Sequence, residues 1–316
     1  MTWLYKDDLF VQHDTGIGHP ERPDRYRACH QALKQSGLMA RCLAGATRVA
    51  DPGEVARVHP GNYFDQVRNL CLQGGGHLDP DTPVCPVSHT VAMTAAGTAI
   101  AAVDAVLSSG GESSKRNAFC LIRPPGHHAT PDQPMGFCLF NNVAIAARHA
   151  QKVHGLKRVL IVDWDVHHGN GTQDIFYDDP TVSFLSIHRY GNGFYPGTGA
   201  ADETGQGDGL GATQNIPLRM GVSRADFLAA FARGLEWAGR HKPELILLSA
   251  GFDACREDPV GDLGLEPGDY QHLTRALMQL ADTHCGGKMV SLLEGGYNLE
   301  QLSLSVEEHV RTLLGS

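Results

Sequence analysis

The sequence lacks the cysteine spacing of disulfide-rich or zinc-finger domains. Its eight cysteines are scattered, and none belongs to a C-x-x-C pair. That spacing is the usual mark of cysteine-based metal and redox sites, so these classes are not favoured. No signal peptide precedes Trp3, Leu4 and Tyr5, and we therefore expect a cytoplasmic protein in a reducing compartment.

Long apolar runs and positive charge are also scarce. No uninterrupted apolar run approaches the roughly 18 residues that span a bilayer, so we expect no membrane-spanning segment. Lys and Arg number 26 against 35 Asp and Glu, and the formal net charge is -9 at pH 7. This balance disfavours nucleic acid and anionic membranes as partners, whereas cationic substrates remain compatible with it.

What the sequence does contain is a regular alternation of strands and helices. Apolar runs rich in β-branched residues predict buried strands at 119–122, 159–162, 182–187, 245–249 and 289–293. Helices are predicted at 24–36, 92–107, 142–154, 226–240, 269–284 and 299–314. The alternation predicts an α/β fold with a parallel sheet, organised as one domain over residues 1–316.

Some segments interrupt this pattern. Residues 73–90 are rich in glycine and proline, so we expect a long surface loop in which Asp79 and Asp81 are solvated. Residues 108–117 are expected to form a polar linker. An early turn-rich loop contains three polar residues that are expected to brace it, with a role in a site as the alternative: His19, Glu21 and Arg22.

A polar cluster directly follows each of the predicted strands. The clusters lie at 123–128, 163–170, 188–190, 251–253 and 294–298. In open α/β sheets, ligands bind at the carboxyl ends of the strands. We therefore expect these loops to converge on one crevice.

The cluster at 163–170 has the composition of a metal site. If the backbone stays extended, Asp163, Asp165 and His167 share one face, because side chains alternate along a strand. Carboxylate oxygen and imidazole nitrogen suit a divalent first-row metal. The alternative is that these acids and His168 cap a helix or bind loop backbone, which would be the better interpretation of an isolated D-x-H.

Asp253 is the candidate for a third ligand because it follows another strand. With Asp165 and His167 it makes an Asp2His set that leaves coordination positions for water and substrate. We expect one metal rather than two, because the neighbouring alternate positions are not carboxylates: Gly169, Gly251 and Cys255.

Paired histidines and a tyrosine complete the candidate site. His127 and His128 could supply a general base and its electrostatic partner, and Asp163 and Asn170 are candidates to bond their far ring nitrogens. Tyr297 could donate its hydroxyl to a developing oxyanion. Taken singly, the histidines could form a structural turn and Tyr297 could be a core residue; their joint occurrence with the metal set favours catalysis.

The ordered motifs resemble those of a known family. R-P-P-G-H-H, D-W-D-V-H-H-G-N-G-T-Q, S-I-H-R-Y, S-A-G-F-D and E-G-G-Y-N, with H-P-E-R-P near the start, are similar to motifs of the zinc-dependent histone deacetylase family. The form is closest to class II and bacterial members. The resemblance implies the arginase-deacetylase fold, in which helices flank a central parallel sheet of about eight strands.

The resemblance also implies roles for individual residues. It implies Zn2+, with Fe2+ as the alternative metal in the cell, bound by Asp165, His167 and Asp253. It implies catalysis by His127, His128 and Tyr297, with His128 as general base. It implies a substrate tunnel at Gly136, Phe137, Tyr195 and Val260, and a structural K+ near Asp163, Asp165, His167, Ser186 and Ile187.

Departures from the family pattern bear on the substrate. Tyr195 stands where many relatives have phenylalanine, and it adds a hydroxyl to the tunnel wall. Asn170 stands where class I enzymes carry Asp, so the second imidazole of the pair has a neutral partner, as in class II. Val260 stands where polyamine-preferring relatives place glutamate, which favours acylated lysine in a peptide or protein over the alternative, an acetylated polyamine. A non-catalytic acyl-binding module is disfavoured by the intact metal, His-His and Tyr set. The sequence predicts no oligomeric state.

Overall fold

The computed structural model describes residues 2–108 and 117–315. Its main feature is an eight-stranded sheet with the order β2-β1-β5-β10-β9-β6-β7-β8, in which all neighbouring strands are parallel. These strands are β1 (Thr2–Tyr5), β2 (Leu43–Gly45), β5 (Asn117–Cys120), β6 (Val159–Asp163), β7 (Val182–Arg189), β8 (Thr213–Leu218), β9 (Leu245–Ala250) and β10 (Met289–Leu293). A separate antiparallel hairpin is formed by β3 (Gly76–Asp79) and β4 (Thr82–Val84).

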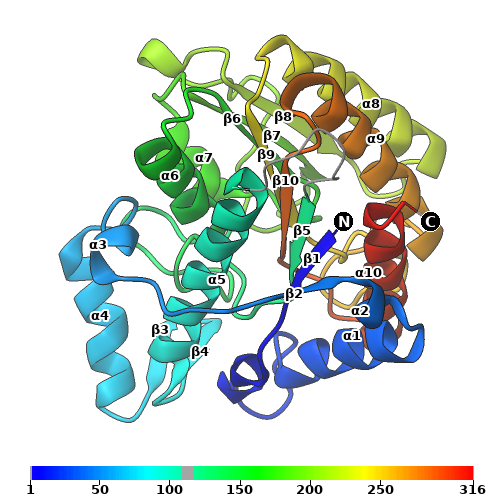
Figure 1. The fold of residues 1–316 in the computed structure, drawn as a ribbon. Helices are drawn as coiled ribbons and strands as arrows, with labels where there is room; N and C mark the ends of the chain where they lie inside the picture. Colours follow the sequence, from blue (N-terminus) through cyan, green and yellow to red (C-terminus); the bar gives the residue numbers. More distant parts are fainter. Residues whose placement is uncertain (1, 109–116, 316) are drawn as a thin grey trace.

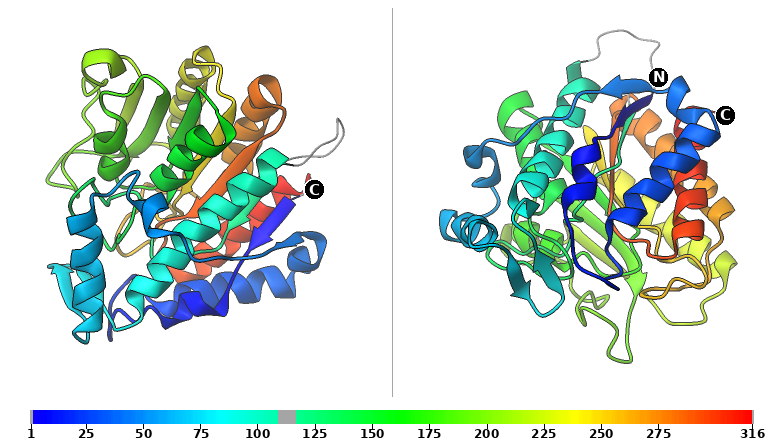
Figure 2. Two further views of the ribbon diagram at one scale, coloured as in Figure 1. Left: turned by 60° about the vertical axis from the view of Figure 1, so that its left-hand side comes forward. Right: turned by 90° about the horizontal axis from the view of Figure 1, so that it is seen from below.

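Helices cover both faces of the sheet. One group contains α3 (Pro52–Val55), α4 (Gly61–Leu72), α5 (Ser88–Ser108), α6 (Asn142–His154) and α7 (Asn170–Phe176). The other contains α1 (Pro23–Gln35), α2 (Leu38–Arg41), α8 (Arg224–Arg240), α9 (Pro267–Cys285) and α10 (Leu299–Leu313). Short 3-10 helices lie at η1 (Asp8–Gln12) and η2 (Gly207–Gly209). The two groups lie on opposite sides of the sheet (Figures 1 and 2).

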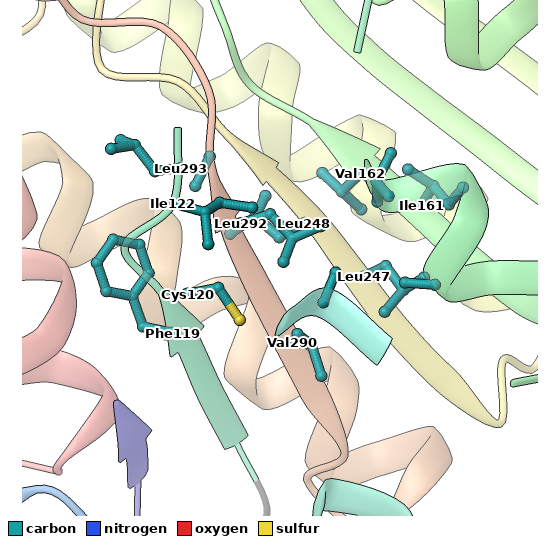
Figure 3. Close-up of a cluster of buried hydrophobic side chains, with 14 of the residues drawn as sticks. Phe119, Cys120, Ile122, Ile161, Val162, Leu247, Leu248, Val290, Leu292 and Leu293 are labelled. Carbon is teal, nitrogen blue, oxygen red and sulfur yellow. The ribbon is translucent and has the colours of Figure 1, made fainter. Parts of the chain in front are cut away.

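The core lies along the central strands. Every residue of β5, β6, β9 and β10 is buried, as expected where helices cover both faces of a parallel sheet. Figure 3 shows apolar side chains from these strands, including Phe119, Leu248 and Leu292, packed together. The continuous apolar runs in the sequence follow from this two-sided burial.

Helix α5 packs unusually close to its neighbours. A Cβ atom on Gly97 would lie 2.2 Å from the carbonyl oxygen of Arg48, so only glycine allows the chain to pass there. By length and composition α5 could cross a membrane, yet 72% of its apolar window is buried inside the protein, the pattern of a core helix.

The predicted fold class is confirmed: a central parallel sheet of eight strands is flanked by helices. Each predicted central strand and helix is present within a few residues of its predicted ends. The prediction of an irregular loop at 73–90 was wrong, because the segment forms the β3–β4 hairpin and the first turn of α5. Of the predicted linker, Ser108 and Asn117 belong to α5 and β5, and the rest lies outside the described residues.

Candidate metal and active site

The site lies at the carboxyl edge of adjacent strands. Strands β5, β10, β9 and β6 are neighbours in the sheet, and each is followed by one of the polar loops. In the register of these strands, Asp163 at the end of β6 pairs with Ser249 of β9. The parallel order therefore brings together loops that are far apart in the sequence.

Asp165, His167 and Asp253 form a buried cluster in these loops. His167 Nδ1 lies 3.0 Å from Asp165 Oδ1 and 3.2 Å from Asp253 Oδ2. Burial lowers the pKa of His167, but its interactions with the carboxylates of Asp165 and Asp253 outweigh burial and raise the pKa to about 9. Burial and the charge of Asp165 raise the pKa of Asp253 to about 7. The cluster thus holds two carboxylates whose repulsion a cation would relieve.

The surroundings of the cluster fit a metal ion. The backbone N–H of Val166 donates to Asp253 Oδ1 at 2.8 Å, whereas the buried Oδ2 of Asp253 accepts no hydrogen bond from the described residues. A Cβ on Gly251 would lie 2.1 Å from Asp165 Oδ2, and one on Gly295 would lie 2.1 Å from Asp253 Oδ2. The two glycines leave the space that the carboxylates occupy, and the oxygen and nitrogen donors suit Zn2+.

The two adjacent histidines have different partners. His127 Nδ1 donates to Asp163 Oδ2 at 2.9 Å, and His128 Nδ1 donates to the neutral Asn170 Oδ1 at 2.7 Å. Burial lowers the pKa of His127, but Asp163 and Asp165 outweigh it and raise the pKa to about 10. Burial, reinforced by the charges of His127 and His167, holds the pKa of His128 well below its ordinary value. The surroundings therefore favour the protonated form of His127 and the neutral form of His128.

Glu294 holds the histidine loop in place, a role that sequence reasoning missed. Its Oε2 accepts from the backbone N–H groups of Gly126 and His127 at 2.6 and 3.2 Å. Burial raises the pKa of Glu294 to about 7 although the charge of His127 opposes this shift. A carboxylate directly after an apolar strand was the available signal.

Asp258 connects the loops after β9 and β10, a second role that was missed. Its Oδ2 accepts from the backbone N–H of Tyr297 at 2.7 Å, and its Oδ1 accepts from Val260 at 3.0 Å. The guanidinium of Arg25 lies 4.8 Å from the ring centroid of Tyr297. Tyr297 is therefore held at its backbone N–H by Asp258 and contacted on one ring face by Arg25.

A cavity of about 320 Å³ opens beside the cluster. It is lined by Asp81, His128, Gly136, Phe137, His167, Gly193, Phe194, Tyr195, Val260 and Tyr297. The structure thus places a ligand of the Asp2His set, one imidazole of the pair and the candidate oxyanion donor on one cavity. All four predicted tunnel residues also line it.

Two residues of the cavity differ from expectation. Asp81 was predicted to be solvated, but it lines the cavity because the hairpin turn that carries it folds over the site. Phe194, which was not singled out from the sequence, stacks on His167 with ring centroids 5.0 Å apart. The hydroxyl of Tyr195 is buried without a hydrogen-bond partner in the described chain.

Residues predicted near a structural K+ lie deeper in the sheet. Asp163 and Ser186 are register partners in β6 and β7, and both are buried. Ser186 Oγ bonds His188 Nδ1 at 2.8 Å. Ile187 follows on β7 and is also buried.

The loop that contains His19, Glu21 and Arg22 is joined to other segments around the site by buried ion pairs and hydrogen bonds. Glu21 is fully buried and accepts from Arg25 Nη1 at 2.9 Å and from Arg123 Nη2 at 2.7 Å. His19 Nδ1 accepts from the backbone N–H of Glu21 at 3.1 Å, and its Nε2 donates to the carbonyl oxygen of Asp81 at 3.2 Å. Arg22 is the exception, since its half-exposed side chain pairs only weakly, with Asp24 at 3.7 Å.

The fold and the site define an α/β protein with a buried Asp2His cluster and a histidine pair at the carboxyl edge of a parallel sheet. A family model described as histone deacetylase domain matches residues 19–313. The chain therefore belongs to the histone deacetylase family.

Curated relatives and a solved structure support this assignment. The chain is 44% identical over 306 residues to the polyamine deacetylase HDAC10 of Homo sapiens, covering 93% of this chain and 44% of that protein. It is 41% identical over 290 residues to a histone deacetylase-like amidohydrolase of Pseudomonas aeruginosa, covering 92% and 75%. The crystal structure of the HDA15 HD domain superposes with a TM-score of 0.91 at 38% identity, covering 99% of this chain and 89% of that chain. The chain spans less than half the length of the human relative.

Proposed function

We propose that this chain is a zinc-dependent amidohydrolase that removes acetyl or similar acyl groups from lysine side chains. One observation carries the proposal: His167 of the Asp2His cluster, His128 and Tyr297 all line one cavity. Zn2+ bound by Asp165, His167 and Asp253 would supply Lewis acidity, which polarises a carbonyl and makes water more acidic. Fe2+ is the alternative metal in the cell.

His128 is the proposed general base. Its Nδ1 carries the proton donated to Asn170, which leaves Nε2 as the free proton acceptor. Its neutral state makes it able to take a proton from the attacking water and to return it to the leaving amine. His127, held by Asp163, keeps a positive charge beside it.

Tyr297 is the proposed oxyanion donor. Burial holds the pKa of its hydroxyl well above the ordinary value despite the opposing charge of Arg25, so the hydroxyl keeps its proton. A protonated phenol on the cavity wall can donate to the oxygen of the acyl group as negative charge develops there.

The cavity walls suit an extended acylated side chain. Phe137 and the pair Phe194 and Tyr195 supply aromatic surface for methylene groups, and Gly136 leaves room beside His128. Val260 adds apolar contact at the same cavity. A structural K+ near Asp163, Asp165, His167, Ser186 and Ile187 is part of the same proposal.

An acetylated polyamine is the second candidate substrate. The human relative is named a polyamine deacetylase, and the half-buried Asp81 places a carboxylate on the cavity where none was expected. A carboxylate at this point could attract the second ammonium of a polyamine. The absence of a carboxylate at Val260 favours the lysine substrate.

The test is an assay of the purified protein with acetyl-lysine peptides, before and after metal removal by a chelator. We expect deacetylation that stops on chelation and returns with Zn2+. Stoichiometric loading with Zn2+ but no release of acetate from any acylated lysine or polyamine would overturn the proposed function.

A further inference from the structure

A second group of possible metal ligands lies on the helical layer, outside the candidate active site. It consists of Asp104 on α5 and His149 and His154 on α6, whose ligand atoms all lie within 4.8 Å of one another. Helices α5 and α6 pack side by side on one face of the sheet (Figure 1). None of these three residues lines the cavity described above.

Both imidazoles aim the same nitrogen at one carboxylate. Asp104 Oδ1 lies 2.6 Å from His149 Nε2 and 2.7 Å from His154 Nε2. Ring centroids of the two histidines are 5.6 Å apart, and their planes are inclined by 65°. Both Nε2 atoms therefore face the same carboxylate oxygen, so the three atoms that could bind one metal ion already lie close together.

The exposure of the group would allow an ion to enter and keep water ligands. The side chain of His149 is 5% exposed, that of His154 22% and that of Asp104 43%. Tetrahedral coordination with bonds of about 2.0–2.1 Å places ligand atoms about 3.3 Å apart. The nitrogens now lie 2.6 and 2.7 Å from Asp104 Oδ1, so they would have to move away by less than about 1 Å, and the side chains of Asp104 and His154 are partly exposed.

The buried ligand has an outer partner. Glu54 Oε1 lies 3.7 Å from His149 Nδ1, the ring nitrogen that points away from Asp104. A carboxylate in this position orients a metal-binding imidazole in many sites. Arg57 Nη1 also approaches this nitrogen, at 3.5 Å, so Glu54 and Arg57 compete for it.

We propose that Asp104, His149 and His154 bind a second divalent transition metal, which bridges α5 and α6 and is independent of the active site. Two imidazoles and one carboxylate suit Zn2+ best among abundant cellular metals. Since the ligands come from two helices, bound metal ties these helices together and stabilises the folded state.

The experiment is a factorial measurement of bound Zn2+ after equilibrium dialysis of the full chain. We expect two Zn2+ per chain in the unmodified protein, one in Asp253→Ala, one in His154→Ala and none in the double variant. His272→Ala, which changes an exposed histidine on α9, should keep both ions. Added Zn2+ should raise Tm in Asp253→Ala but not in the double variant.

The design separates this proposal from the proposed function. His154→Ala should deacetylate substrate as fast as the unmodified protein, which also shows that it folds. If the active-site cluster bound no metal, the unmodified protein would bind one ion and His154→Ala none. Two ions in His154→Ala, or none in Asp253→Ala, would mean that the three residues only hydrogen-bond one another and would overturn the second site.

Discussion

At the scale of single residues, the candidate site depends on glycines as much as on ligands. Asp165 and Asp253 reach one point because the backbone beside them carries no side chains. Their separation also depends on backbone donors, since Gly295 N–H donates to Asp165 Oδ2 at 2.8 Å. Small changes in these neighbours should therefore act directly on metal binding.

Gly295→Ala should abolish metal binding at the Asp2His cluster. The new Cβ would lie 2.1 Å from Asp253 Oδ2 and 2.5 Å from Asp165 Oδ2, so the carboxylates must move. We expect one Zn2+ fewer per chain and a loss of at least about 100-fold in kcat/KM, corresponding to about 2.7 kcal/mol. Metal analysis and steady-state kinetics measure both. Gly268→Ala is the matched control, because its Cβ meets no atom within 4 Å; equal zinc in the two variants would contradict the prediction.

Tyr297→Phe should lower kcat without loss of metal. The hydroxyl is the one group removed, and removal of an oxyanion donor costs about 10² to 10³ in kcat. Zinc content and the circular dichroism spectrum should match those of the unmodified protein. Tyr190→Phe, outside the cavity lining, serves as the control. Unchanged kcat in Tyr297→Phe would make this tyrosine a structural residue.

At the scale of elements, buried polar groups hold helices and loops to the sheet. Arg25 of α1 donates from Nε to the carbonyl oxygen of Gly296 at 2.6 Å and also bonds Glu21 and the carbonyl oxygen of Glu294. One side chain thus joins a helix to the loop that carries Tyr297. The two elements are far apart in the sequence.

Arg25→Met should destabilise the fold strongly. It leaves Glu21 buried with one cation fewer and two carbonyl oxygens without a donor, and breaking a buried ion pair costs about 3–5 kcal/mol. Arg27→Met on the same helix is the control, since its ion pair with Asp24 is exposed and is worth at most about 1 kcal/mol. Urea unfolding measures both free energies. A loss below about 1 kcal/mol in Arg25→Met would contradict the role assigned to it.

His59 should make stability depend on pH. Its Nδ1–H donates to the carbonyl oxygen of Pro131 and its Nε2 accepts from the N–H of Asn141, which fixes the neutral form. Burial lowers the pKa of His59 from 6.5 to about 4, against the opposing hydrogen bond to Pro131. Its contribution is therefore complete above about pH 6.5 and is lost as pH falls toward 4, because only the unfolded state binds the proton there.

The measurement is urea unfolding at pH 7, 6 and 5. In the unmodified protein, His59 should contribute up to about 1.4 kcal/mol per pH unit to the slope of unfolding free energy against pH. In His59→Gln this slope should be smaller by up to that amount, which corresponds to one proton. Identical slopes in the two proteins would show that His59 does not titrate between these states.

Elements with a continuous apolar pattern were predictable, and short or edge elements were not. The strand at 289–293 and the helix at 142–154 have the predicted ends because burial on both faces or on one stripe leaves a clear pattern. Strands β2 and β4 have only three residues, too few to show a period. Edge strand β8 contains Pro217 and only half-buried positions at its end.

The residues of the candidate site likewise divide into those that the sequence predicts and those that it does not. Residues directly after apolar strands, such as Asp165 and Asp253, could be assigned because strand ends converge in a parallel sheet. Asp81 could not, since its place on the cavity depends on how a hairpin folds over the edge. Glu294 and Asp258 act through backbone N–H groups. The position of Glu294 directly after an apolar strand marks it as a candidate, but no sequence pattern identifies the N–H groups that it binds.

At the scale of the whole molecule, the balance of charges around the cavity should decide substrate choice. The net charge of -9 acts diffusely and is screened beyond a Debye length of about 8 Å at physiological salt. Local groups at the cavity, Asp81 and Val260, therefore dominate. The carboxylate of Asp81 would attract the second ammonium of a polyamine, whereas Val260 offers only apolar contact.

The unmodified protein should have a higher kcat/KM for acetyl-lysine peptides than for acetylspermidine or acetylputrescine. Val260→Glu should shift the ratio toward polyamines and Asp81→Asn should shift it away, each measured by competition of the two substrates. Val260→Gln, of similar size without charge, is the control. A preference of the unmodified protein for polyamines above about tenfold, or roughly 1.4 kcal/mol, would replace the lysine substrate by the polyamine.

The order of the strands has a consequence for how the chain is made. Residues 2–120 supply β2-β1-β5, residues 159–250 supply β9-β6-β7-β8, and β10 lies between β5 and β9. During translation, the two parts of the sheet cannot be joined before residues 289–293, which form β10, have been synthesised. The loop that bears Tyr297 follows β10 directly, so the open strand edges that favour aggregation of a nascent chain lie beside the candidate active site.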